Sequence, residues 1–342
     1  MRILYGVTGE GLGHAMRSRV VAEHLRARGH DVKLVASRRA CAYLQRYFDD
    51  VEEIPGFTLT YVRGGIGRLR TVARNGRGAR AAIRDSIDLY RWPIASFAPD
   101  VCLTDFDSFA HVFGKLLGRP VISIDHQHVI DRCDHPPRIA RRLSLTRAVV
   151  RAKIPRCAHY VVTSFYRPPL RTHLQDSTTL VGPILRPEVL ALTPTTGDHV
   201  LVYQTATRDL VEPLFGLPRQ RFIVYGCGEG GTRANVTLRG FDEATFLADL
   251  ASAKAVICNG GYTLMSEALY LGKPVLSVPL RRHGEQQLNA SYLEALGLGR
   301  RAHVPDAATY RDFLERLPEP PRIAAGNGDA LTTIDTLLEE IR

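Results

Sequence analysis

Residues 259–290 read Asn-Gly-Gly-Tyr-Thr-Leu-Met-Ser-Glu-Ala-Leu-Tyr-Leu-Gly-Lys-Pro-Val-Leu-Ser-Val-Pro-Leu-Arg-Arg-His-Gly-Glu-Gln-Gln-Leu-Asn-Ala. The four apolar residues before this stretch, 255–258, predict a short buried strand. Gly260 and Gly261 allow a tight turn, because glycine tolerates positive φ. Residues 263–271 then have helical spacing, and a glycine and a proline end the helix before a second strand at 275–278. The stretch therefore predicts a strand–turn–helix–strand unit of an α/β domain.

The turn into this helix predicts a phosphate site. A helix N-terminus presents unpaired backbone N–H groups and the positive end of the helix dipole, so Gly260 and Gly261 can hold a diphosphate. Tyr262 and Thr263 belong to the same turn and are included in the expected donor site. Glu267 lies one turn further, where its two oxygens can accept hydrogen bonds from the neighbouring hydroxyls of a ribose. The residues together predict a site for a nucleoside diphosphate.

The same stretch resembles the donor-binding motif of GT-B glycosyltransferases, both the UDP-glycosyltransferases and the peptidoglycan N-acetylglucosaminyltransferase. The resemblance is carried by small residues entering a helix, a glutamate on it, a Gly-x-Pro and a Gln-x-x-Asn-Ala run, here Gly260, Gly261, Glu267, Gly272, Pro274, Gln286, Asn289 and Ala290. It implies an α/β GT-B fold, in which two Rossmann-like domains face each other across a cleft. The alternative is an ordinary αβ corner in which Glu267 is solvated.

Further donor contacts are expected outside the helix. Glu285 and Gln286 are predicted to lie in a loop after the second strand, where a carboxylate and an amide can bind sugar hydroxyls. In the resembling families, backbone at the position of Phe241 meets the nucleotide base. Those families also carry a loop of small residues that contacts phosphate. This chain departs from that pattern, because it has Thr205 and Arg208 there, and we expect Thr205 or Arg208 to make the phosphate contact.

A second glycine-rich run, Thr-Gly-Glu-Gly-Leu-Gly-His, occupies residues 8–14 between a strand at 2–7 and a helix expected at 15–28. A dinucleotide-binding frame starting at Gly9 puts His14 where the third glycine belongs. The next strand lacks the acidic residue that holds the NAD ribose, although Arg38 and Arg39 leave an NADP site open.

This run resembles the first loop of GT-B glycosyltransferases, and the resemblance implies that His14 is the general base that deprotonates the acceptor. Histidine suits the role because it titrates near neutral pH. The alternative is that His14 caps the helix or binds acceptor phosphate. By the same resemblance Asp105, at the end of a strand over 101–104, pairs with His14. Asp107 is the second choice for that pairing and a better N-cap for the helix that follows.

Gly11 and Gly13 of the first loop belong to the expected acceptor side. His126 and His128 follow a strand at 120–124, and we expect them to contact the acceptor. They lack a convincing set of carboxylates or cysteines around them, so no metal site is predicted. Residues 105–107 spell Asp-x-Asp, but not in the context of a metal-dependent GT-A enzyme.

Length and composition set broad limits. A chain of 342 residues can form two domains, which we expect over 1–186 and 187–342, with the final helix packing back on the first. The six cysteines are scattered, and no apolar run approaches the ~18 residues of a membrane span. The N-terminus runs directly into a strand, so no signal peptide is expected and a cytoplasmic location is predicted.

The net charge of +10 is concentrated in two runs of the first domain. Residues 63–84 contain seven arginines and residues 138–156 contain six arginines and one lysine, with no acidic residue in either. In the second run apolar or neutral side chains recur at helical spacing, namely Ile139, Leu143, Thr146, Val149 and Val150. The pattern suggests a basic amphipathic helix on the anionic inner face of a membrane. The alternative is a core helix with a solvated basic face.

These observations predict an inverting, metal-independent glycosyltransferase that uses a nucleotide sugar, UDP before GDP, and no cofactor. The hydroxyl acceptor is expected to be a small molecule or a lipid-linked compound. Three alternatives stay open: a GT-B sugar-nucleotide epimerase, an NADP-dependent reductase, and a nucleic-acid-binding protein suggested by the basic charge. No nucleic-acid-binding motif is present, so nucleic acid is not expected as a partner.

Overall fold

The computed structural model describes residues 1–56, 61–62, 65–66, 94–204, 209–228, 230–319 and 322–342. The described residues form two compact units. The first runs up to Arg186 and includes residues 325–342, and the second comprises residues 187–324 with the hairpin of β4 (Tyr61–Val62) and β5 (Gly65–Ile66). All six cysteines are free thiols.

The first unit is built on a parallel sheet of order β3-β2-β1-β6-β7-β8-β9. Its strands are β1 (Arg2–Val7), β2 (Asp31–Ala36), β3 (Val51–Glu53), β6 (Val101–Asp105), β7 (Val121–Asp125), β8 (His159–Thr163) and β9 (Thr178–Val181). The strand order reverses between β1 and β6, and open α/β sheets bind ligands beside such a switch point, at the carboxyl ends of the strands.

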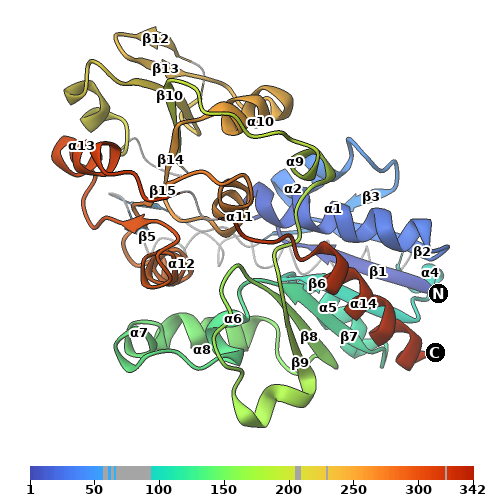
Figure 1. Cartoon of the computed structure of the whole chain (residues 1–342). Coiled ribbons are helices and arrows are strands. Elements are labelled where there is room, and N and C mark those ends of the chain that lie inside the picture. The colour runs from blue at the N-terminus through green and yellow to red at the C-terminus, as the bar shows by residue number, and fades with distance from the viewer. Residues whose placement is uncertain (57–60, 63–64, 67–93, 205–208, 229, 320–321) are drawn as a thin grey trace. The chain divides into compact units, whose positions relative to one another are not determined.

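Helices cover both faces of this sheet (Figure 1). They are α1 (Leu12–Ala27), α2 (Arg38–Leu44), α4 (Ala95–Phe97), α5 (Ser108–Leu116), α6 (Val129–Arg132), α7 (Pro137–Arg142), α8 (Ser144–Lys153) and α14 (Asn327–Ile341), with a 3-10 helix η2 (Thr172–Ser177). Among the described residues, no helix is both long and apolar enough to cross a membrane.

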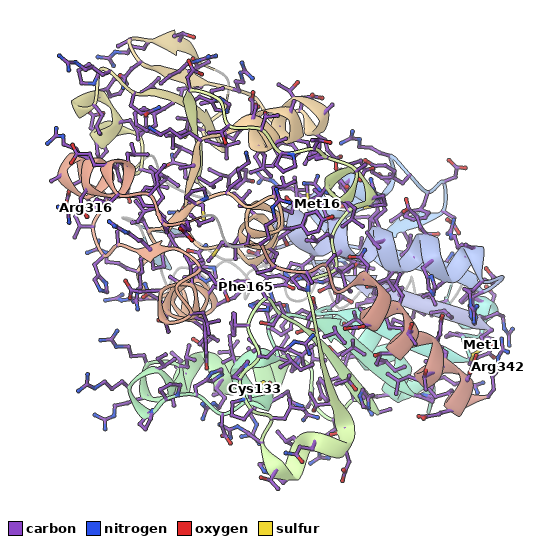
Figure 2. The ribbon with its side chains drawn as sticks, viewed as in Figure 1. Met1, Met16, Cys133, Phe165, Arg316 and Arg342 are labelled. Carbon is purple, nitrogen blue, oxygen red and sulfur yellow. The ribbon has the colours of Figure 1, made fainter. Side chains whose placement is uncertain are left out.

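Helix α14 returns from the end of the second unit to pack on the first, beside β8 and β9 (Figure 1). Its Ala330 and Ile334 are buried in the same core as the side chains of β1. Asp335 of α14 accepts from His24 Nε2 of α1, with 3.0 Å to each carboxylate oxygen. The chain therefore starts and ends at the same end of this unit, as the labels of Met1 and Arg342 in Figure 2 show.

The second unit has a sheet of order β12-β13-β11-β10-β14-β15-β16, parallel except for β12. The strands are β10 (His199–Tyr203), β11 (Arg221–Tyr225), β12 (Gly231–Arg233), β13 (Val236–Leu238), β14 (Ala255–Cys258), β15 (Val275–Ser277) and β16 (Arg300–Arg301). The helices are α9 (Pro187–Leu190), η3 (Glu212–Gly216), α10 (Glu243–Ser252), α11 (Tyr262–Tyr270), α12 (Gly284–Ala295) and α13 (Ala307–Glu315).

The predicted basic helix over 138–156 is wrong as a single element. The run splits into α7 and α8, and Leu143, which lies between them, is buried. The supposed stripe is not continuous either, because Val150 is buried while Val149 is 54% exposed. The other basic run, 63–84, lies almost entirely outside the described residues.

Candidate active site

His14 lies in the first turn of α1, which begins at Leu12 and not at Ala15 as predicted. Gly11 is the N-cap, and its φ of 101° turns the chain from the loop into the helix. That conformation favours glycine, because other residues meet a steric penalty there. No side chain caps this end of α1, whereas the imidazole of His14 is nearly buried. The helix thus fixes where the ring can point.

Asp105 is the last residue of β6 and lies in register with Val7 of the neighbouring strand β1. Its Oδ1 is 2.7 Å from Nδ1 of His14, so the structure brings the predicted pair together. A carboxylate oxygen at this distance accepts a hydrogen bond, and therefore Nδ1 carries the proton. In the tautomer with its proton on Nδ1, the ring presents the lone pair of Nε2, which is the arrangement a proton-accepting histidine requires.

Two residues that the sequence analysis passed over complete the environment of Asp105. Arg17 donates from Nε to Oδ2 at 2.9 Å and from Nη2 to Oδ1 at 2.6 Å. Ser18 donates from Oγ to Oδ2 at 3.0 Å. The sequence could have indicated both residues, because positions three and four after His14 lie on the same face of a helix. The predicted helix began at Ala15 and left His14 outside it, so this spacing was not considered.

Gln127 is the third neighbour of His14, with its amide nitrogen 3.2 Å from Nε2. The two histidines that flank it make other contacts and are buried. His126 Nδ1 lies 2.8 Å from the carbonyl oxygen of Thr163, and His128 Nδ1 lies 2.7 Å from Oδ2 of Asp125. Of these three residues, Gln127 is therefore the one that lies next to Nε2 of His14, and His126 and His128 are not.

Asp107 is the N-cap of α5, accepting from the backbone N–H of Ala110 at 2.9 Å. Burial raises the pKa of Asp107 to about 6. Gly6 of β1 makes room for this cap, since a Cβ there would be 2.6 Å from Asp107 Oδ1. Burial also lowers the pKa of Lys153, whose Nζ lies 4.2 Å from the centre of the ring of Phe106.

In the second unit, the Gly-Gly turn leads from β14 into α11 as predicted. Gly260 has a φ of 91°, and a Cβ there would be 2.8 Å from Oγ of Ser277. Gly261 is the N-cap of α11, and no side chain caps this end. Asn289 donates from Nδ2 to the carbonyl of Gly260 at 3.1 Å. The asparagine of the Gln-x-x-Asn-Ala run thus supports the turn, which leaves the helix N-terminus able to bind an anion.

Tyr262 and Thr263 form the first turn of α11, and Glu267 lies one turn further along, where its side chain is 2% exposed. Glu285 and Gln286 are not in a loop as predicted, because they form the first turn of α12. The side chain of His283 caps that helix, an uncommon N-cap that the sequence pattern did not indicate.

Gln286 is buried, and its Oε1 accepts from the backbone N–H of Leu280 at 3.0 Å. The ring of Phe241 is partly exposed and lies 5.5 Å from that of Phe246. Thr205 lies outside the described residues.

The two units define the class of the protein. Each is a Rossmann-like α/β sheet with a strand–turn–helix corner, and together they are the GT-B fold. The family model described as glycosyl transferase family 1 matches residues 1–318. The chain therefore belongs to this family and is a glycosyltransferase.

Relatives and solved structures agree with this membership. An uncharacterized glycosyltransferase of Methanosarcina acetivorans is 25% identical, over 99% of this chain and 98% of its own length. A UDP-N-acetylglucosamine–N-acetylmuramyl-(pentapeptide) pyrophosphoryl-undecaprenol N-acetylglucosamine transferase of Bacillus cereus is 32% identical, over 22% of this chain and 23% of its own. The structure of UGT89C1 of Arabidopsis thaliana with quercetin is similar with a TM-score of 0.66, at 16% identity and covering 99% of both chains.

Proposed function

We propose that this glycosyltransferase moves a sugar from a UDP-sugar to a hydroxyl group of its acceptor, with inversion at the sugar carbon and without a metal. The observation that carries the proposal is the His14–Asp105 pair, in which Nδ1 donates to the carboxylate and Nε2 is the proton acceptor. Nε2 takes the proton of the acceptor hydroxyl as its oxygen attacks the sugar carbon on the face opposite the diphosphate. One such displacement inverts the configuration.

The donor corner supports the rest of the mechanism. The uncapped N-terminus of α11 at Gly261 offers backbone N–H groups and a positive dipole end to the departing diphosphate. Among the described residues, no three His, Cys, Asp or Glu side chains gather as metal ligands.

The assay uses mass spectrometry of the purified protein with a panel of nucleotide sugars and hydroxyl acceptors. Transfer should require both substrates and should persist in EDTA. A changed sugar formed without any acceptor would identify an epimerase instead, and inhibition by EDTA that Mg²⁺ or Mn²⁺ reverses would contradict the metal-free step.

Glu267 is assigned to the ribose, because one carboxylate can accept from the 2′- and 3′-hydroxyls together. Calorimetry should show UDP binding about 10–100-fold more tightly than dTDP, since a hydrogen bond to a charged group contributes about 1.5–3 kcal/mol. Glu267→Gln should reduce this preference. Equal affinity for the two nucleotides would exclude the assigned role of Glu267.

A lipid-linked acceptor is proposed from the surface of α8. Leu145 and Val149 are 48% and 54% exposed and lie one turn apart on α8. Arg141, Arg142 and Arg151 are exposed around them. Apolar side chains surrounded by cations complement an anionic bilayer surface, with each basic residue adding about 1 kcal/mol.

Vesicle sedimentation tests this surface. The protein should pellet with anionic vesicles and stay in the supernatant with neutral ones, and added salt should release it. Changing Arg141, Arg142 and Arg151 to Glu should abolish pelleting. The matched control changes three exposed arginines of the second unit to Glu, Arg219, Arg311 and Arg322, because it alters the net charge equally. Equal loss in both triple variants would show attraction by net charge and no specific surface.

A further inference from the structure

Arg17 is a buried arginine whose guanidinium binds the carboxylate of Asp105 at two points. Its two hydrogen bonds to Asp105, from Nε and Nη2, form a bidentate pair, which is the strongest arrangement available to this side chain. Arg17 and Asp105 are 88 residues apart and both are nearly inaccessible to solvent. A buried ion pair of this kind is costly to form unless every donor and acceptor is satisfied.

The oxygens of Asp105 are satisfied by four donors, two from Arg17 and one each from Ser18 and His14. The charge of the carboxylate is therefore shared between a permanent cation and an imidazole. Nη2 of Arg17 also lies 3.2 Å from Nδ1 of His14. Because Nδ1 carries the proton that Asp105 accepts, this approach is not a hydrogen bond but a cation held beside the ring.

The sign of the effect on His14 follows from these distances. The carboxylate favours the imidazolium, whereas the guanidinium disfavours it, and the two opposite charges lie at similar distances from the ring. We propose that Arg17 is a positioning residue that neutralises Asp105 and keeps His14 uncharged, so that Nε2 is available to accept a proton. This inference rests on the proposed role of His14 as the general base.

Other charged or titratable groups surround the cluster, and the test must separate Arg17 from them. Burial raises the pKa of Tyr5, with a further contribution from Asp105, while Ser18 and Arg17 act in the opposite direction. Lys153 of α8 interacts electrostatically with Asp105, and also with Asp107, Glu10 and Asp125. Lys153, Asp107, Glu10 and Asp125 are not altered in the variants below.

The experiment follows the titration of the His14 ring by NMR in histidine-labelled protein between pH 5 and 9. The resonance is identified by its loss in His14→Gln. Arg17→Met should move the titration midpoint of His14 upward by about one pH unit or more, because a cation next to the ring is removed. Arg17→Lys, which keeps the charge, should move it much less. Asp105→Asn should move it downward.

Arg19→Met is the matched control, since Arg19 is a buried arginine on the same helix whose ion pair is with Glu23. It should lower stability and leave the midpoint of His14 unchanged. If Arg17→Met does not fold, Arg17→Gln removes the charge while keeping a hydrogen-bond donor. An unchanged or lowered midpoint in a folded Arg17→Met or Arg17→Gln protein would overturn the inference, as would an equal shift in Arg19→Met.

The failure of this inference can be told apart from the failure of the proposed function. The ring titration needs no substrate and reports on Arg17 directly. Sugar transfer at the wild-type rate in His14→Gln would discard the general base and with it the proposed mechanism. When both hold, the acid limb of the pH–rate profile should move upward in Arg17→Met, in parallel with the ring titration.

Discussion

Two histidine–aspartate pairs lie at the ends of neighbouring strands in the first unit. His14 pairs with Asp105 at the end of β6, and His128 pairs with Asp125 at the end of β7. In both, Nδ1 of the ring lies 2.7 Å from a carboxylate oxygen, and in both a serine hydroxyl also donates to the carboxylate. The two pairs therefore share two hydrogen bonds to the carboxylate, one from the imidazole and one from a serine.

They differ in charge. The carboxylate of Asp125 is bonded by Ser123 and by the ring and backbone of His128, whereas that of Asp105 is also bonded by the guanidinium of Arg17. Burial by itself lowers the pKa of His128, but the Asp125 carboxylate outweighs it, so the net pKa is raised. Burial likewise raises the pKa of Asp125, and its interactions with His128 bring it well below its usual range.

The second pair is thus an ion pair with both partners buried, and its outer ring nitrogen, Nε2 of His128, is enclosed without a hydrogen-bond partner among the described residues. In the first pair Nε2 faces Gln127, and a cation already balances the carboxylate. In the proposed mechanism the two pairs differ in a third group, because the guanidinium of Arg17 supplies a positive charge next to Asp105 and keeps the imidazole of His14 neutral.

The largest expected effect comes from making the same substitution in both pairs. His14→Gln should reduce turnover about 10²–10⁴-fold, the usual loss for a general base, and leave UDP affinity nearly unchanged. Gln is chosen because its amide group reaches the position of Nε2 but places no polar atom at the position of Nδ1, which contacts the carboxylate. His128→Gln should retain turnover within about threefold when rates are corrected for the folded fraction, because His128 accepts no proton in the proposed mechanism. Equal losses of turnover would break the comparison.

The next effect is on stability and should appear in the second pair. His128→Gln leaves the buried Asp125 carboxylate without its cation, and breaking one side of a buried pair costs about 3–5 kcal/mol. Urea unfolding of the wild type and both glutamine variants measures it. His14→Gln should cost less, since Asp105 keeps its bidentate bond to Arg17. The comparison fails if His14→Gln is the more destabilised protein.

The stability contributed by His128 should depend on pH with a defined sign. Its folded-state pKa is raised, so the contribution is complete below the unfolded value of about 6.5 and is lost as pH rises through the folded value. The depressed pKa of Asp125 has its effect only below about pH 4, near the unfolded value of an aspartate. The difference in Tm between wild type and His128→Gln, measured from pH 5 to 9, should therefore shrink as pH rises. A difference that grows would contradict the ion pair.

The smallest expected effect is the difference in stability between alanine variants of the two serines. Ser123→Ala should destabilise the protein by about 1.5–3 kcal/mol, the range for a hydrogen bond to a charged group, because Asp125 has fewer donors. Ser18→Ala should cost less than this and change turnover by no more than about threefold, because Arg17 still holds both oxygens of Asp105. Unfolding curves and rates of both variants, measured side by side, check this ranking.

Much of the fold could be predicted from local pattern. Strands expected at 2–7 and 255–258 have these bounds in the structure, because continuous apolar residues between turn residues specify a strand without reference to distant contacts. Two helix starts were predicted wrongly, each for its own local reason. Leu12 and Gly13 look like loop because glycine disfavours helix, and His283 is an unusual N-cap.

The candidate site was predictable only in part. The resemblance to GT-B glycosyltransferases, together with the placement of Asp105 at the end of a strand, led us to expect its contact with His14, with Asp107 as the second choice. Arg17 could have been found from its helical spacing to His14, had α1 been started at Leu12. Gln127 could not, since nothing in Asp-His-Gln-His tells which of the three polar side chains after Asp125 lies next to His14 of α1.

The sequence by itself determined the two strand–turn–helix corners, at Gly11–His14 and at Gly260–Glu267, because a glycine turn and an uncapped helix N-terminus are local properties of a few residues. Only the tertiary structure decided what each histidine contacts. Arg17 and Asp105 meet because β1 and β6 are neighbours in the sheet although 88 residues separate the two side chains. Electrostatic interactions inside a protein depend on such contacts between residues distant in the sequence, because charges brought together out of water interact far more strongly than the same charges in solvent.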